Sequence, residues 1–221
     1  MLTYRSVELV AALGVTAVLL LASPAASPAP ADGPAAALAR RIEQRHHRVT
    51  DLTARFVQTY RSGMLSQEVV EKGVVSLKRP GRMLWEYRDP EKKTFVSDGK
   101  TFYFYVPADR QVIVREQAGQ RGIPALLLSG REDLLADFEA TLEKAPGPGL
   151  QRLKLVPRKA DPEVERVYLD VDSADRIRAV HVRDAQGNES RFDFEGIREN
   201  VGLPDRLFRF EVPRGVEVIA G

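Results

Sequence analysis

Cysteine is absent from all 221 residues, and its absence excludes several kinds of protein. Without a thiol the chain can form no disulfide framework, thiol nucleophile or zinc–thiolate site, and no cysteine can carry a lipid. Histidine is scarce too, with three residues. His46 and His47 are adjacent on a predicted helix, so they point in different directions and cannot share a metal as an i, i+4 pair would. We interpret both as exposed helix residues, and His181, alone in a predicted strand, as structural.

Catalytic signatures are missing as well. The sequence has no Gly-x-Ser-x-Gly motif and no Asp-x-Asp-x-Asp-Gly calcium loop, and its acidic residues are interspersed with basic ones. The loop Gly147–Gly149 lacks the strand and helix that a phosphate-binding loop requires. The sequence therefore predicts a protein that is not an enzyme and that uses no cofactor and no metal.

A large excess of one charge is also lacking. The 33 Lys and Arg residues nearly balance the 31 Asp and Glu residues, which leaves a net charge of +2. So small a charge does not recruit nucleic acid nonspecifically, and we expect no nucleic-acid partner. The hydrophobic share of 43% is enough for one sizeable core. No internal repeat is visible. We expect the protein to be a monomer.

The apolar run from Leu9 to Ala22 is shorter than the ~20 residues that span a bilayer. Arg5 precedes the run, and small residues follow it. This order is typical of a secretory signal peptide rather than of a retained membrane anchor. We expect residues 1–31 to be signal peptide and linker, and residues 32–221 to be one exported domain without a lipid anchor.

Hydrophobic periodicity predicts a mainly β protein with a few helices. A proline start and an apolar stripe predict a first helix from Pro34 to about Arg48. Short apolar runs bounded by Gly, Pro or Asp predict about eleven strands: Leu52–Tyr60, Glu68–Lys78, Met83–Arg88, Thr94–Ser97, Thr101–Val106, Gln111–Glu116, Leu150–Val156, Val164–Asp172, Arg176–Arg183, Glu189–Gly196 and Leu207–Val212. So wide an antiparallel sheet curves strongly until it is closed or nearly closed. Two short helices, Ile123–Leu128 and Glu132–Phe138, interrupt it. The first could cover the concave face or be an ordinary core helix.

The stretch from Gly73 to Tyr105 is the richest in aromatic residues and turns. Arg79-Pro80-Gly81 and Asp98-Gly99 predict two tight turns between strands. Because side chains alternate along a strand, Met83, Trp85 and Tyr87 lie on one face of their strand. Phe102, Phe104 and Val106 likewise lie on one face of a neighbouring strand. Alternation alone does not decide which face points inward. The aromatic surplus favours a sheet that holds an apolar ligand.

The motifs Lys78-Arg79-Pro80 and Val96-Ser97-Asp98-Gly99-Lys100-Thr101, with Trp85 between them, resemble those of the LolA family. This family comprises periplasmic carriers of outer-membrane lipoproteins. The close resemblance runs from about Phe56 to Val114, and a weaker one covers Phe208 to Val216.

The resemblance implies an unclosed antiparallel barrel whose concave side is covered by an N-terminal helix and short lid helices. It implies a hydrophobic cavity for lipoprotein acyl chains, lined by these residues: Met83, Trp85, Tyr87, Phe102, Phe104, Ile123, Leu126 and Leu127. It makes Arg79 a latch that holds the lid helices shut while the cavity is empty. Relatives often have an aromatic residue where this chain has Met83. By the resemblance, this position lies in the region that contacts the loading and receiving partners.

The resemblance also implies the partners and the compartment. Cargo would come from an inner-membrane lipoprotein-releasing ABC transporter and pass through the periplasm to an outer-membrane acceptor lipoprotein. Two alternatives remain open: a LolA-like periplasmic lipid or glycolipid binder, and a regulatory domain that senses lipoproteins.

Overall fold

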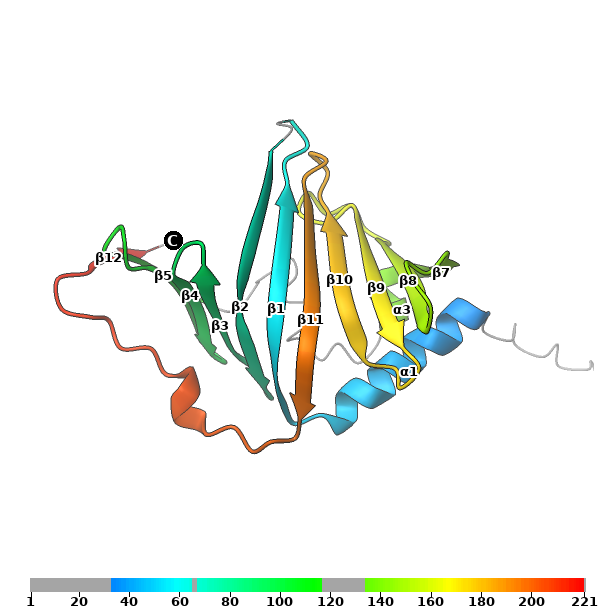
Figure 1. Cartoon of the computed structure of the whole chain (residues 1–221), viewed down its shortest axis with the longest axis horizontal. Helices are drawn as coiled ribbons and strands as arrows, with labels where there is room; N and C mark the ends of the chain where they lie inside the picture. The colour runs from blue at the N-terminus through cyan, green and yellow to red at the C-terminus, as the bar shows by residue number, and fades with distance from the viewer. Residues whose placement is uncertain (1–32, 65–66, 117–133, 221) are drawn as a thin grey trace, which may run out of the picture. The chain divides into compact units, whose positions relative to one another are not determined.

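The computed structural model describes residues 33–64, 67–116 and 134–220. A helix, α1 (Pro34–Arg48), precedes a long series of strands (Figure 1). The other helical elements of the described residues are short: α3 (Leu134–Asp137) and the 3-10 helix η1 (Asp205–Phe208). The strands are β1 (Asp51–Arg61), β2 (Glu68–Lys78), β3 (Arg82–Asp89), β4 (Lys93–Asp98), β5 (Thr101–Val106), β6 (Gln111–Glu116), β7 (Phe138–Glu143), β8 (Leu150–Pro157), β9 (Arg166–Asp172), β10 (Ile177–Arg183), β11 (Glu189–Glu199) and β12 (Glu217–Ala220).

Within the described residues these twelve strands form one sheet, in the order β12-β6-β5-β4-β3-β2-β1-β11-β10-β9-β8-β7. Neighbouring strands are antiparallel, except that β12 runs parallel to β6. The outermost strands, β12 and β7, are not paired with each other, so the barrel is unclosed. The predicted fold class, an unclosed antiparallel barrel with an N-terminal helix, is confirmed.

The sheet is strongly curved, and the aromatic rings on its inner face show by how much. Trp85 on β3 and Phe192 on β11 have ring centroids 5.3 Å apart, although β2 and β1 lie between their strands. In a flat sheet three strand spacings of about 4.8 Å would separate them by roughly 14 Å. The curvature therefore brings side chains from distant strands together over one concave face.

Local chemistry explains the two predicted turns. Gly81 (φ 63°) and Gly99 (φ 99°) take backbone angles that favour glycine. The Asp98 carboxylate accepts hydrogen bonds from the backbone N–H groups of Lys100 and Thr101, at 2.8 Å each, which closes the β4–β5 hairpin.

Two apolar clusters lie on opposite faces of the sheet. The inner cluster joins Leu38 and Ile42 of α1 to side chains of strands from both halves of the sheet, including Trp85 and Phe194. The outer cluster is smaller and is built around Leu84, Val96 and Phe208, with Tyr103 and Phe210 packed against it.

These clusters settle which faces point inward. Met83, Trp85, Tyr87 and Phe102 belong to the inner cluster, and Phe104 packs against it. The alternate residues of β3 and β5 face the outer cluster, where Tyr103 and Tyr105 meet Phe210 with ring centroids 5.3 and 5.5 Å apart. The strand Thr101–Val106 is apolar on both faces because Phe210 of the C-terminal segment packs against Tyr103 and Tyr105 on its outer face.

One predicted strand was wrong, and two strands were not predicted. The predicted strand Leu207–Val212 does not form: Phe208 ends the 3-10 helix η1, and the alternating phenylalanines Phe208 and Phe210 serve packing rather than strand pairing. The strands β7 and β12 were not predicted.

The predicted helix Glu132–Phe138 is shorter among the described residues. There α3 covers Leu134–Asp137, and Phe138 already belongs to β7. The predicted helix Ile123–Leu128 lies outside the described residues.

Candidate apolar ligand cavity

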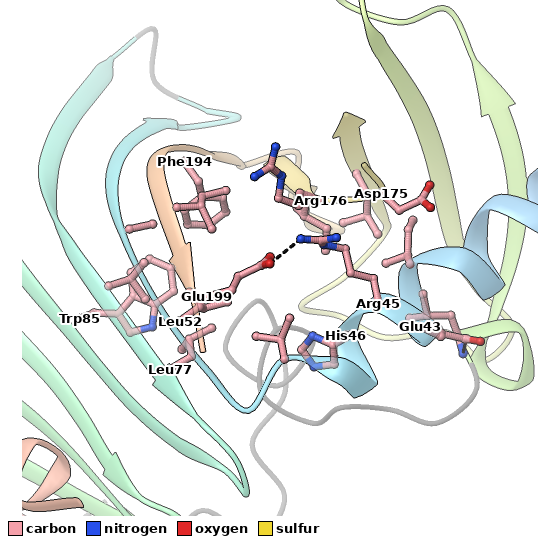
Figure 2. A pocket seen from close by; sticks show the side chains of 18 residues that line it. Glu43, Arg45, His46, Leu52, Leu77, Trp85, Asp175, Arg176, Phe194 and Glu199 are labelled. Carbon is pink, nitrogen blue, oxygen red and sulfur yellow. Dashed lines mark hydrogen bonds and ion pairs between the residues drawn. The ribbon is translucent and has the colours of Figure 1, made fainter. Parts of the chain in front are cut away.

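A cavity of about 110 Å³, here called the helix-side cavity, lies between α1 and the concave face (Figure 2). Aliphatic and aromatic side chains make up most of its wall: Ile42, Val49, Leu52, Ala54, Val75, Leu77, Trp85, Leu134, Leu169, Ile177, Phe194 and Ile197. The polar lining comes from Glu43, Arg45, His46, Asp175, Arg176 and Glu199. An apolar wall with a few charged groups suits a ligand that is mostly hydrocarbon.

Charged contacts fasten α1 to the sheet beside this cavity. Arg45 donates a hydrogen bond to Glu199 of β11, drawn as the dashed line in Figure 2. Arg41 pairs with Asp175, in the turn between β9 and β10, at 3.0 Å. The Glu43 carboxylate accepts a hydrogen bond from the backbone N–H of Leu134, where α3 begins. Such partly exposed ion pairs are individually weak, so the buried side chains Leu38, Ala39 and Ile42 contribute most of the packing of α1 on the sheet.

A second cavity, of about 320 Å³, lies farther along the same concave face and is here called the strand-side cavity. Its apolar wall is formed by Met83, Trp85, Tyr87, Phe95, Phe102, Val182 and Phe192. Its polar lining is formed by Gln58, Tyr60, Glu163, Asp184, Asn188 and Ser190. Trp85 lines both cavities, so the two hollows meet at its ring.

Four of the predicted cavity residues line the strand-side cavity: Met83, Trp85, Tyr87 and Phe102. Phe104 lines neither cavity, but it supports the wall by stacking on Phe95 with ring centroids 4.3 Å apart. The other three, Ile123, Leu126 and Leu127, lie outside the described residues.

Arg79 contacts the end of α1. Its Nη2 donates a hydrogen bond to the backbone carbonyl of His46 at 2.6 Å, and its own backbone N–H donates to the Thr50 carbonyl at 2.9 Å. Carbonyls at a helix C-terminus carry partial negative charge, which a guanidinium stabilises. Burial lowers the pKa of Arg79 from its usual value. Whether Arg79 also reaches Ile123–Leu128 lies outside the described residues.

His46 is half-buried beside this contact, so the expectation that both helix histidines are exposed was wrong for His46 and right for His47. Burial lowers the pKa of His46 to about 4, and the positive charges of Arg79 and His47 act in the same direction. His46 is therefore neutral at physiological pH. His181 is held in the sheet by stacking on Tyr168, with ring centroids 5.5 Å apart.

The sequence analysis missed several aromatic residues of the inner face. Phe56 packs edge-on against Trp85 and Tyr87, with ring centroids 4.9 Å from each, and Phe192 and Phe194 of β11 complete the group. The alternation of Phe192 and Phe194 with charged neighbours could have identified them as inward-facing.

Together, the fold and the cavities form an unclosed barrel with an apolar hollow that a helix covers on one side. The model of the family described as "Outer membrane lipoprotein carrier protein LolA" matches residues 47–211. The chain belongs to this family.

Named relatives agree. An outer-membrane lipoprotein carrier protein of Chromohalobacter salexigens is 31% identical over 216 residues, which cover 97% of this chain and 98% of that protein. One from Hahella chejuensis is 33% identical over 176 residues, covering 77% and 82%. A crystal structure of an uncharacterized conserved protein from Thermus thermophilus has the same fold, with a TM-score of 0.53 at 15% identity, and covers 84% of this chain and 98% of that one.

The family is one of carriers rather than enzymes. In residues 33–64, 67–116 and 134–220, no helix has the length and hydrophobicity needed to span a bilayer.

Proposed function

We propose that this protein carries lipoproteins through the periplasm from the inner to the outer membrane, with their acyl chains held in the hydrophobic hollow on the concave face. The observation that carries the proposal is the wall of this hollow, where aromatic and aliphatic side chains from both halves of the sheet surround two adjoining cavities. Family membership supports lipoproteins as the cargo.

Hydrophobic transfer energies explain why a carrier is needed. Each exposed methylene costs about 0.8 kcal/mol in water, so a chain of about 16 carbons costs on the order of 10 kcal/mol. A lipoprotein with two or three such chains does not leave a membrane unaided. A hollow that accompanies the chains removes most of this cost without any covalent step.

In this proposal a monomer is exported by its N-terminal signal peptide and receives cargo from an inner-membrane lipoprotein-releasing ABC transporter. An outer-membrane acceptor lipoprotein then takes the cargo. Arg79 acts as the latch of the empty state by holding the end of α1 through the His46 carbonyl. Release of that contact lets α1 move away from the concave face, and acyl chains occupy the space.

The test is to express the full chain in a Gram-negative host, purify it from the periplasm and analyse it by native mass spectrometry. We expect a mature N-terminus between about Ala26 and Asp32, and bound species that carry lipoprotein acyl chains. Full-length protein retained in the membrane would contradict the export step. Bound phospholipid or glycolipid without lipoprotein would contradict the proposed cargo and favour a lipid binder.

A matched pair of variants tests the site. Leu77 of β2 lines the helix-side cavity, whereas Val70 of the same strand is 43% exposed. Leu77→Asp places a charge in the hollow and should abolish cargo binding, while Val70→Asp should leave it unchanged. Circular dichroism must show that both variants fold. Equal cargo binding by the two folded variants would contradict a binding site in the helix-side cavity.

A further inference from the structure

The indole of Trp85 carries a buried hydrogen-bond donor without an acceptor. The side chain is 4% exposed, and Nε1 has no hydrogen-bond partner among the described residues. An indole N–H can only donate, and buried tryptophans usually find a partner for it. A donor left unpaired in an apolar interior costs about 1–3 kcal/mol. So costly a feature at the centre of a binding site points to a partner that arrives with the ligand.

The surroundings of Trp85 explain why none of the described residues supplies an acceptor. The rings of Phe56, Phe192 and Phe194 surround it, with centroids 4.9, 5.3 and 6.2 Å from its own. None of these side chains has an acceptor atom.

Tyr87 offers an internal comparison, because it lies two residues farther along the same face of β3 and lines the same strand-side cavity. Its hydroxyl donates a hydrogen bond to Oε1 of Gln58 at 2.6 Å. Among the described residues, one of these two neighbouring donors therefore has a partner, and the other, at the junction of the two cavities, has none.

We propose that Trp85 recognises the ester end of the ligand's acyl chain by donating a hydrogen bond from Nε1–H to the ester carbonyl oxygen. This inference rests on the proposed function, because it needs an acyl ligand in the hollow. A carbonyl oxygen that follows its chain out of water loses its own hydrogen bonds. One bond to Trp85 then satisfies two buried polar groups at once, which a purely alkyl ligand cannot do.

The position of Trp85 between the cavities makes this geometry useful. A carbonyl held there leaves its hydrocarbon chain free to run into either cavity. The hollow thereby selects chains joined by an ester over chains joined by an ether, whose oxygen is the weaker acceptor. Trp85 becomes a specificity-determining residue in a site whose wall is mostly apolar.

The test replaces the N–H without changing the ring's shape, by incorporating 3-benzothienylalanine at position 85, which has sulfur in place of the indole nitrogen. Two probes are titrated: a lipopeptide whose glyceryl group carries two palmitoyl esters, and its analogue with two hexadecyl ethers. For the parent protein we expect the ester probe to bind about five- to tenfold more tightly, the size of one net hydrogen bond. For the variant we expect equal affinities, reached by weaker ester binding.

Tyr103→Phe is the control, because Tyr103 packs against the outer cluster on the opposite face of the sheet and lines neither cavity. We expect it to keep the ester preference. A parent protein that binds both probes equally would overturn this inference and leave the carrier proposal intact. An ester preference that survives benzothienylalanine would also overturn it, since the donor would lie elsewhere. Failure of the parent to bind either probe would instead contradict the proposed function.

Discussion

Replacing Arg79 by leucine should make the protein bind cargo more tightly and release it more slowly. In the described structure the Arg79 guanidinium donates to the His46 carbonyl at 2.6 Å, across the junction between β2 and the end of α1. The backbone N–H of Arg79 separately donates to Thr50, and this bond survives the substitution. Arg79→Leu therefore removes the side-chain contact with α1 while keeping the local backbone geometry.

The magnitude follows from the kind of bond. A hydrogen bond to a charged group contributes about 1.5–3 kcal/mol. If only the closed, empty state makes this bond, its loss shifts the equilibrium toward the open state by that amount. Apparent affinity is reduced by the fraction of molecules that are closed, so the variant should bind cargo roughly tenfold to a hundredfold more tightly where the closed state dominated beforehand.

The assay uses Trp85, the single tryptophan of the chain. Because Trp85 lines both cavities, its fluorescence should change as a fatty-acyl ligand is titrated in, and the titration gives the affinity of each variant. A second measurement gives the rate of cargo transfer to acceptor membranes. Circular dichroism checks that each variant folds.

Arg82→Leu is the matched control. Arg82 lies on the far side of the same turn and pairs with Asp205 of the C-terminal segment at 3.1 Å, not with α1. Its loss should change neither affinity nor transfer rate. A folded Arg79→Leu variant that binds less cargo than the parent, or hands it over as fast, would refute the latch.

Three further predictions concern stability. Because the pKa of His46 is about 4 in the folded protein and near 6.5 when unfolded, its contribution to stability is complete above pH 6.5 and is lost as pH falls toward 4. In urea titrations, His46→Gln should reduce the loss of stability between pH 7 and 5 by about 2 kcal/mol. Gly73→Ala should destabilise the protein by about 1–3 kcal/mol or more, because the new Cβ would lie 2.1 Å from the Glu86 carbonyl oxygen. Gly147→Ala should be neutral in the same titration, because its new Cβ would have nothing within 4 Å. Phe208→Ala should cost about 3–5 kcal/mol in thermal unfolding, because the side chain is 1% exposed in the outer cluster; a loss below about 1 kcal/mol would argue against that packing.

Much of the fold could be predicted because most strands show local signals. The three strands between Glu68 and Asp98 have alternating side chains, and a proline–glycine corner joins the first two. The ends of these strands were therefore predicted to within one residue. Strands without such signals were missed. β7 follows α3 directly, and the helix predicted for Glu132–Phe138 includes its first residue. β12 has four residues that add to the β6 edge from far along the chain. Their pairing depends on tertiary contacts that no short window of sequence contains.

The binding site, like the fold, could be predicted only where local sequence signals determine it. Alternation grouped Met83, Trp85 and Tyr87, but the choice of the inward face depends on what covers each side, and that is decided by α1 and by the segment around Phe208. The role of Phe192 depends on curvature, which brings β11 opposite β3.

The most direct test of the central claim is photo-crosslinking with a diacylated lipopeptide that carries a diazirine near the end of one acyl chain. We predict that the label attaches to peptides from the concave wall, those containing Trp85 or Phe192–Phe194, and that excess unlabelled lipopeptide prevents it. The same peptide without acyl chains should not compete. Labelling confined to the outer cluster around Tyr103 and Phe210, or labelling that unlabelled lipopeptide does not prevent, would contradict the claim that the hollow holds the acyl chains.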